Sequence, residues 1–146
     1  MNRLADSNIW VAFTIQPHVF HDPVRTWFAA IPGSDSAVFC RSTQQSFLRH
    51  LTTASVFSHY GLSPFDNRTA WEHYEKILKH PRVAFVEEPP GLDALWKKFT
   101  FGTRPSPKLW MDAYLAAFAI AGGYRFVTTD RGFKQFKNLD LHLIEG

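Results

Sequence analysis

Short apolar segments alternate with amphipathic helical patterns along the whole chain. Segments with the length and composition of short buried strands occupy residues 3–5, 37–40, 83–86 and 126–129, and the alternating segment 139–144 is typical of an edge strand. Helical periodicity fills the intervals, at residues 9–13, 23–31, 43–51, 67–78, 92–99 and 109–121. Because parallel strands need long crossover connections, this alternation predicts an α/β fold, a central parallel sheet of about four or five strands with helices on both faces.

Several predicted helices begin beside residues that commonly cap helices. Ser7 and Asn8 are predicted to cap the first helix, Asp22 the second, and Asp66 or Asn67 the helix that precedes the third strand. No repeat, low-complexity tract or linker interrupts the pattern. We therefore expect a single domain.

The composition is that of an ordinary globular protein. Apolar residues make up 45% of the chain and aromatic residues 16%, which excludes a disordered protein, and we expect residues 1–146 to form one domain. Cys40 is the only cysteine, which excludes an internal disulfide and a zinc–thiolate site and favours a reducing compartment. No apolar run reaches the ~20 residues that cross a bilayer, and Asp6 interrupts the position of a signal peptide, so we expect a cytoplasmic protein.

Basic residues gather in two stretches that contain no acid. The formal net charge is only +3, but no acidic residue occurs from Ala94 to Met111, and a second basic cluster follows Asp130. On charge alone, two solvated faces are the ordinary interpretation, and a polyanionic partner is permitted rather than required. The basic residues of the two stretches are Lys97, Lys98, Arg104 and Lys108, and then Arg131, Lys134 and Lys137.

Three aspartates stand where solvation does not explain them. Asp6 directly follows the first predicted strand and Asp130 follows the strand 126–129, so both are expected at the same edge of a parallel sheet. Asp112 lies among apolar neighbours near the start of the helix 109–121, and the start of a crossover helix faces that edge. Like charges that converge raise one another's pKa, and a divalent cation relieves the conflict. Ligation by oxygen atoms alone favours Mg²⁺ or Mn²⁺.

Each aspartate also has an ordinary structural interpretation, which the sequence leaves open. Asp6 can cap the first helix, Asp112 can stabilise a helix N-terminus through the helix dipole, and Asp130 can be a turn residue. The aromatic residues near the first basic stretch also have two interpretations, stacking on a base or packing in the core. Phe101 is the better candidate for stacking on a base because it lies in a predicted loop, whereas Trp110 lies in a helical pattern typical of core packing.

Three segments, in order and at their observed spacing, carry a family pattern. They are residues 4–10 (LADSNIW), 106–119 (SPKLWMDAYLAAFA) and 126–133 (FVTTDRGF). Together they resemble the strand-Asp-x-Asn start, the Asp-Ala-Tyr-Leu-Ala helix and the Thr-x-Asp-x-x-Phe ending of PIN-domain ribonucleases of the VapC toxin type. The resemblance covers essentially the whole chain and implies the PIN-like three-layer sandwich, with the central parallel sheet between two layers of helices.

The resemblance also implies the function of the converging residues. Asp6, Asp112 and Asp130 would be the catalytic ligands of Mg²⁺ or Mn²⁺, and Asn8 and Thr128 would be polar supports that hold the ligands by hydrogen bonds. The protein would be an endoribonuclease that cleaves structured translational RNA, a loop of tRNA or rRNA, by metal-activated water. It would be the toxin of a VapBC-type toxin–antitoxin pair, inhibited by a small VapB-like antitoxin.

The resemblance gives the basic stretches a role and adds a homodimer. The residues expected to bind RNA phosphates on either side of the acidic centre are Lys97, Lys98, Arg104, Lys108, Arg131 and Lys134. The homodimer is also expected from apolar helical faces that contain Trp10, Phe13 and Trp27, which we expect to exceed what one small domain buries.

One position departs from the family pattern. Most members carry a Glu on the helix after the second strand, in a Glu-Phe-x-Arg context. When Phe47 and Arg49 are aligned with that pattern, the position of the Glu holds Ser46, so the site carries one negative charge fewer and the number of bound metal ions is open. The polar residues of this helix that remain as supports are Thr43, Gln44 and Ser46.

Two alternatives to a toxin ribonuclease stay open at this point. One is a catalytically weakened PIN-like module that binds RNA or protein, and the other is a PIN-like nuclease of RNA processing outside any toxin pair. A binding module would lack carboxylate-dependent affinity for a divalent metal, which a ribonuclease would show. A toxin would have a short upstream reading frame that encodes a small DNA-binding antitoxin, which a nuclease of RNA processing would lack.

Overall fold

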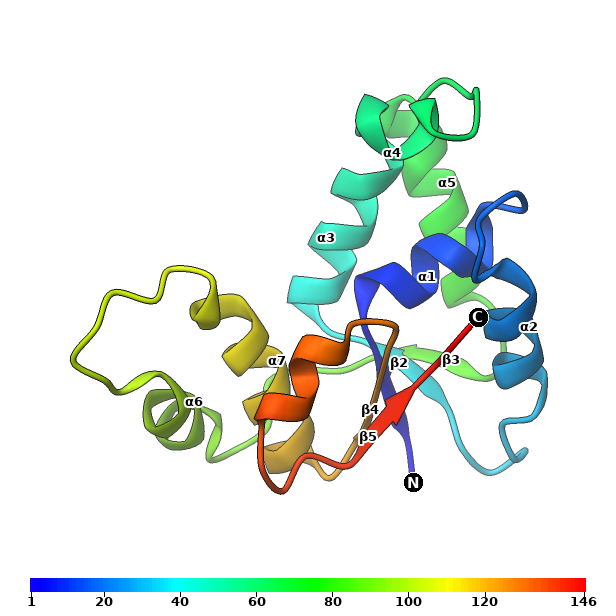
Figure 1. The fold of residues 1–146 in the computed structure, drawn as a ribbon. Helices are drawn as coiled ribbons and strands as arrows, with labels where there is room; N and C mark the ends of the chain where they lie inside the picture. The colour runs from blue at the N-terminus through cyan, green and yellow to red at the C-terminus, as the bar shows by residue number, and fades with distance from the viewer.

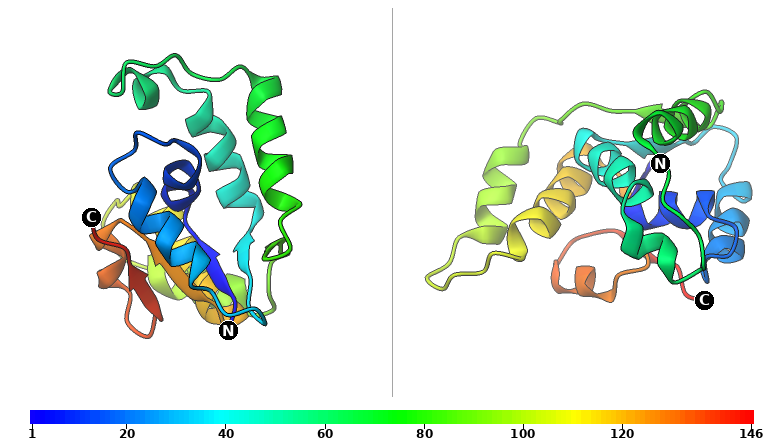
Figure 2. Two further views of the ribbon diagram at one scale, coloured as in Figure 1. Left: turned by 90° about the vertical axis from the view of Figure 1, so that its right-hand side faces the viewer. Right: turned by 90° about the horizontal axis from the view of Figure 1, so that it is seen from above.

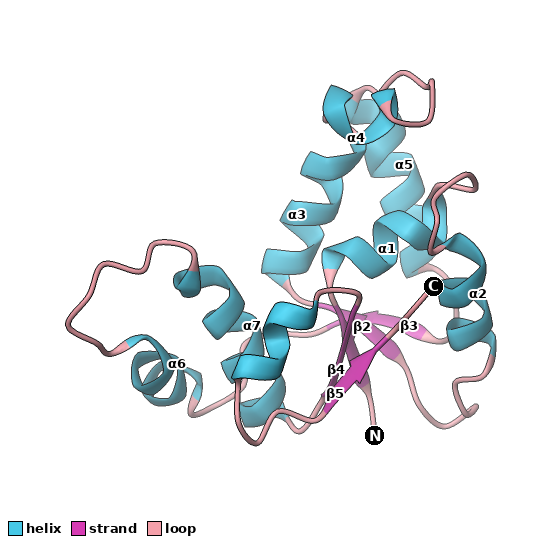
Figure 3. Ribbon diagram, in the orientation of Figure 1, coloured by secondary structure: helices cyan, strands magenta, loops and turns pink.

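Five parallel strands form the centre of the molecule, which a computed structural model describes for residues 1–146 (Figures 1 and 3). The strand order is β3-β2-β1-β4-β5, and every neighbouring pair is parallel. Leu4 at the centre pairs with Val38 on one side and with Phe126 on the other. The predicted parallel sheet with an edge strand at the C-terminal end is confirmed. Its strands are β1 (Arg3–Ala5), β2 (Ala37–Phe39), β3 (Val83–Phe85), β4 (Arg125–Thr128) and β5 (Leu141–Leu143).

Helices cover both faces of this sheet. One face carries α1 (Ser7–Thr14), α2 (His21–Ala29), α3 (Arg41–Leu51), α4 (Ala54–Ser58) and α5 (Asn67–Leu78). The other face carries α6 (Leu92–Thr100), α7 (Leu109–Gly122) and the short 3₁₀ helix η1 (Arg131–Gln135). Figure 2 shows that α3 and α5 run side by side beyond the strands, while α6 and α7 pair on the opposite side.

Two hydrophobic cores result from the alternation of side chains along each strand. Ala5 and Val127 face the core beneath α1, whereas Leu4 and Phe126 face the core beneath α7. The alternation fixes which backbone positions reach the edge of the sheet. It therefore also fixes where the polar residues that follow β1 and β4 emerge.

Three helix starts differ from the prediction, and one helix was not expected. Asp6, rather than Ser7 or Asn8, is the N-cap of α1, and its carboxylate accepts a hydrogen bond from the Ser7 backbone N–H at 2.8 Å. Asp22 lies within the first turn of α2 instead of capping it, because the N-cap is Phe20. The other differences are that α3 begins at Arg41 and that the five-residue helix α4 was not expected.

The capping of α5 follows the prediction. The carboxylate of Asp66 accepts a hydrogen bond from the backbone N–H of Thr69 at 2.8 Å. This is the side-chain cap that satisfies a free N–H group at a helix start.

The aromatic residues that we expected on an exposed apolar face are inside the protein. Trp10 is fully buried and stacks on Phe39 with ring centroids 4.2 Å apart, and Trp27 is 9% exposed. Phe13 is half-buried against Trp10 and Phe28. The expectation was wrong because α2 packs over α1 and covers this face, so these residues lend no support to a dimer. No helix has both the length and the apolar character that crossing a membrane requires.

Candidate active site

The parallel pairing of β1 with β4 brings Asp6 beside Thr128. Ala5 is in register with Val127, and the backbone N–H of Asp6 donates to the carbonyl of Val127 at 2.9 Å. The next position on each strand therefore lies at the carboxyl edge of the sheet. There the hydroxyl of Thr128 donates to Oδ2 of Asp6 at 2.8 Å.

The hydroxyl of Thr128 connects three polar groups from remote parts of the chain. Besides its bond to Asp6, it accepts hydrogen bonds from Nδ2 of Asn8 at 3.3 Å and from the backbone N–H of Asp130 at 3.0 Å. Thr128 is fully buried, so these bonds are shielded from water. This one side chain holds the first aspartate, Asn8 and the backbone of the last aspartate in a fixed arrangement.

The other two aspartates reach the same edge from strand β4 and from the α7 layer. Asp130 follows β4 and is the N-cap of η1, where its Oδ1 accepts from the backbone N–H of Gly132 at 2.8 Å. Asp112 is half-buried in the first turn of α7. It lines a hollow of about 480 Å³ together with Lys108 and Gln135. Asp6 and Asp130 therefore each cap a helix and also lie at the carboxyl edge of the sheet.

The three carboxylates lie close enough to act on one another electrostatically. Burial raises the pKa of Asp6 to about 6, the hydrogen bonds from Thr128 and Ser7 oppose the rise, and the charges of Asp112 and Asp130 add to it. The pKa of Asp112 is also raised, first by burial and then by the charge of Asp130. Mutual repulsion of this kind is relieved by a bound cation.

The oxygen atoms at this edge fit a hydrated divalent cation. Oδ1 of Asn8 is buried and has no hydrogen-bond partner, so an acceptor next to the carboxylates is left unsatisfied. No three His, Cys, Asp or Glu side chains have the arrangement to hold a metal ion by themselves. Mg²⁺ does not require such a cage, because it usually keeps several waters, and a carboxylate can act on it through one of them.

The polar residues expected as supports on α3 are only partly at the site. The hydroxyl of Thr43 is bonded to the backbone of Cys40, and the side chain of Gln44 accepts from Arg41. Both side chains serve the start of α3, and neither bonds to a residue of the carboxylate edge. The structure brings only Ser46 there, because its hydroxyl donates to Oγ of Ser7, the neighbour of Asp6, at 2.9 Å.

Two residues of this network were not singled out from the sequence. The backbone N–H of Ser7 donates to the carboxylate of Asp6, and the hydroxyl of Ser7 accepts a hydrogen bond from the hydroxyl of Ser46. His50 lies one turn after Ser46, and its Nδ1 is 2.6 Å from the Ser46 carbonyl oxygen and 3.3 Å from the Ser46 hydroxyl. The spacing of four residues between Ser46 and His50 on one helix was the available signal.

The basic residues are distributed unequally around the carboxylates. Lys108 lines the hollow that contains Asp112, whereas Lys97 and Arg104 line a larger cavity between α6 and α7. Arg131 forms an ion pair with Glu145, which reduces its availability for a phosphate. Lys98 and Lys134 are exposed on α6 and η1 and line neither cavity.

Comparison with known proteins gives one consistent relationship. Residues 3–139 match the PIN domain family. Ribonuclease VapC41 of Mycobacterium tuberculosis is 45% identical over 142 residues, which cover 97% of each chain.

Solved structures share the fold at low sequence identity. VapBC2 from Rickettsia felis, bound to a DNA fragment from its promoter, has a TM-score of 0.71 and 15% identity, covering 99% of this chain and 100% of the other. VapC20 of M. tuberculosis, a sarcin-ricin loop cleaving toxin, has a TM-score of 0.64 and 13% identity, covering 94% and 97%.

Proposed function

Because this chain belongs to the PIN-domain family and, within it, to the VapC ribonucleases of toxin–antitoxin systems, we propose that it is a metal-dependent endoribonuclease centred on Asp6, Asp112 and Asp130. The observation that carries the proposal is the meeting of these three carboxylates at one edge of the sheet, where the charges of Asp112 and Asp130 add to the rise in the pKa of Asp6 and the charge of Asp130 adds to that of Asp112. A bound cation would allow all three carboxylates to stay charged in this arrangement.

The three aspartates would hold Mg²⁺ or Mn²⁺, with Asn8 and Thr128 as positioning residues. When bound, the ion would lower the pKa of the attacking water and offset the charge that develops on the phosphodiester. Thr128 donates a hydrogen bond to Oδ2 of Asp6, which orients this carboxylate.

The remaining polar groups have separate roles. The Oδ1 atom of Asn8 has no partner within the protein and is free to accept from a water at the site. Lys108, in the hollow beside Asp112, would bind a phosphate next to the cleaved bond.

The substrate and partners follow from the family. We propose that the RNA is a structured translational RNA, a loop of tRNA or rRNA, as the sarcin-ricin loop is for VapC20, and that the protein works in the cytoplasm. A small VapB-like antitoxin would be the partner, as the relationship to VapBC2 suggests. A homodimer stays part of the proposal on the family resemblance alone.

RNA cleavage tests this function. Purified protein should cut RNA with Mg²⁺ or Mn²⁺ and lose cleavage with EDTA. Asp6→Asn, Asp112→Asn and Asp130→Asn should each lower the rate by about 100-fold or more, since each removes a charged ligand. Asp22→Asn is the matched control, because Asp22 is exposed in α2 and should leave the rate unchanged. Wild-type rates in all three site variants would refute the proposal.

One observation favours a second candidate function, a PIN-like module that binds RNA without efficient cleavage. Ser46 stands where most of the family carries Glu, which removes one negative charge. Such a module would bind RNA without carboxylate-dependent affinity for a divalent ion. A non-toxin nuclease of RNA processing would instead cleave RNA but lack an upstream antitoxin gene.

A further inference from the structure

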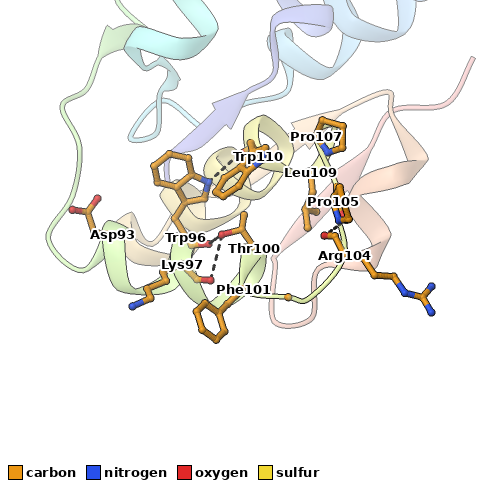
Figure 4. A pocket seen from close by; sticks show the side chains of 12 residues that line it. Asp93, Trp96, Lys97, Thr100, Phe101, Arg104, Pro105, Pro107, Leu109 and Trp110 are labelled. Atoms are coloured by element: carbon orange, nitrogen blue, oxygen red, sulfur yellow. Dashed lines mark hydrogen bonds between the residues drawn. The ribbon is translucent and has the colours of Figure 1, made fainter.

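A second cavity lies between α6 and the start of α7, and three aromatic side chains are on its lining (Figure 4). Its volume is about 710 Å³. This falls within the range of roughly 300–1,000 Å³ that is usual for small-molecule sites. Trp96, Phe101 and Trp110 line it, and Nε1 of Trp96 donates to the carbonyl of Trp110 at 2.8 Å. Figure 4 shows the rings of Trp96 and Trp110 lying together.

Two of these rings are open to solvent. Phe101 is 80% exposed and Trp110 is 52% exposed, which is unusual for large aromatic side chains in a small domain. Trp96 is half-buried and meets Trp110 edge-on, with centroids 6.2 Å apart. The ring of Trp110 is therefore supported by Trp96 and remains half exposed, and the ring of Phe101 is exposed with Lys97 beside it.

The charges on this cavity are mainly positive. Nζ of Lys97 lies 5.6 Å from the centroid of the Phe101 ring, and Arg104 is on the lining with its side chain extending outward to solvent in Figure 4. Asp93 is the one carboxylate on the lining. Aromatic rings flanked by cations match an unpaired nucleobase with a phosphate on either side. An apolar protein segment would match the rings but would leave the cations without partners.

The cavity adjoins the hollow that holds Asp112. Ser106, Pro107 and Leu109 line both. Trp110 and Asp112 are two positions apart on α7, about 200° around the helix, so they face opposite sides of its first turn. A strand that places a phosphate at Asp112 can therefore cross the segment 106–109 and reach the aromatic cavity.

We propose that this cavity, the α6–α7 pocket, receives an unpaired base of the RNA substrate, stacked on Trp110 and Phe101 and close in the strand to the cleaved bond. The inference rests on the proposed function, because it assumes that the RNA strand is bound with a phosphate at Asp112. It makes the pocket a determinant of which RNA loops are cut, separate from the residues that cut them.

The test uses a short single-stranded RNA of mixed sequence and the Asp112→Asn protein, which is not expected to cut it. Trp110→Leu or Phe101→Ala in this background should weaken binding about tenfold, the size of one lost base–aromatic stack. Trp71→Leu is the control, because Trp71 on α5 is 49% exposed and meets Tyr74 edge-on at 6.0 Å, as Trp110 meets Trp96. Its affinity should stay unchanged.

A second comparison isolates the base from the phosphates. The same RNA with abasic positions should bind about tenfold more weakly to the Asp112→Asn protein, and this difference should vanish once Trp110→Leu is added. Equal effects of Trp110→Leu and Trp71→Leu would overturn the inference. So would unchanged RNA affinity with an altered sedimentation coefficient, which would assign the pocket to contact between copies. Failure of wild-type cleavage would instead count against the proposed function.

Discussion

The hydroxyl of Thr128 bonds to the side chain of Asp6, the side chain of Asn8 and the backbone N–H of Asp130. Asp6 and Asp130 are therefore both held by hydrogen bonds to Thr128, and Asp112 is not. Because Thr128 is fully buried, water does not replace a bond that is lost there. The geometry of the carboxylate edge therefore depends on one small side chain that carries no charge.

Thr128→Val tests this dependence. Valine keeps the shape but removes the hydroxyl, so we expect the free energy of unfolding to fall by about 1–3 kcal/mol and divalent-ion affinity to fall about 10- to 100-fold. Thr128→Ser should restore most of both. Urea unfolding and Mn²⁺ titration measure the two effects. A valine variant that matches the wild type in metal affinity would show that the hydroxyl does not position the site.

The pKa of Asp6 makes stability depend on pH. Its folded value of about 6 lies above its ordinary value of 3.8, so the folded state binds the proton more tightly than the unfolded chain does. Stability of the metal-free protein should therefore be greatest below pH about 4 for this group and fall as pH rises to about 6, by at most about 3 kcal/mol.

Thermal unfolding in EDTA checks this sign. The Tm of the wild type should fall between pH 4 and 6 or so, and the fall should be smaller in Asp6→Asn, which has no proton to lose. Adding Mg²⁺ at neutral pH should raise the Tm of the wild type but not that of the variant. Identical pH profiles for the two proteins would contradict the raised pKa.

At the scale of secondary-structure elements, α3 decides which polar residues reach the site. The capping box at its start uses Cys40 and Thr43, which is why the Thr43 hydroxyl is not available elsewhere. One turn further on, Ser46 faces Ser7. The position where the family usually carries Glu is therefore directed at the carboxylate edge, although its side chain is short and neutral.

Ser46→Glu should strengthen metal binding. A fourth carboxylate beside Ser7 adds negative charge, and we expect Mn²⁺ affinity to rise about tenfold, equivalent to roughly 1.4 kcal/mol. Ser46→Gln has nearly the same size without the charge and should leave the affinity near that of the wild type. Equal affinities for the Glu and Gln variants would show that this position does not act on the ion.

The parallel sheet was predictable from the sequence because short apolar segments alternated with helical patterns. The placement of Asp6 and Asp130 at the same edge of the sheet was also predictable, because residues that directly follow neighbouring parallel strands lie at the same edge. The caps were less predictable, because Asp6, Ser7 and Asn8 are all capping residue types and backbone geometry chooses among them. The structure brings the three aspartates to one edge, and their role as ligands stays a prediction.

The sequence pattern did not show how the helices cover one another. Trp10 and Trp27 have the periodicity of an apolar face, and that periodicity is the same whether the face meets a partner molecule or another helix of the chain. Here α2 packs over α1, so the face is internal. Likewise, helical periodicity made Trp110 a core candidate, but it lies in the first turn of α7 and is half exposed.

At the scale of the whole molecule, the site exists only because remote segments fold together. Asp6 leaves the central strand, Asp130 leaves its neighbour, and Asp112 comes from the helix layer on the other face. The two hydrophobic cores hold these layers against the sheet, and the carboxylates repel one another at the place where the layers meet. We propose that a shared cation relieves this repulsion.

Titration of Mn²⁺ into the purified protein near pH 7.5 tests that claim most directly, with free Mn²⁺ followed by its electron paramagnetic resonance signal. The wild type and the control Asp22→Asn should bind the ion with the same affinity. Asp6→Asn, Asp112→Asn and Asp130→Asn should each bind at least about tenfold more weakly, because each removes one charge from the same ion. Equal binding by all five proteins, or no binding by the wild type, would contradict a shared cation site.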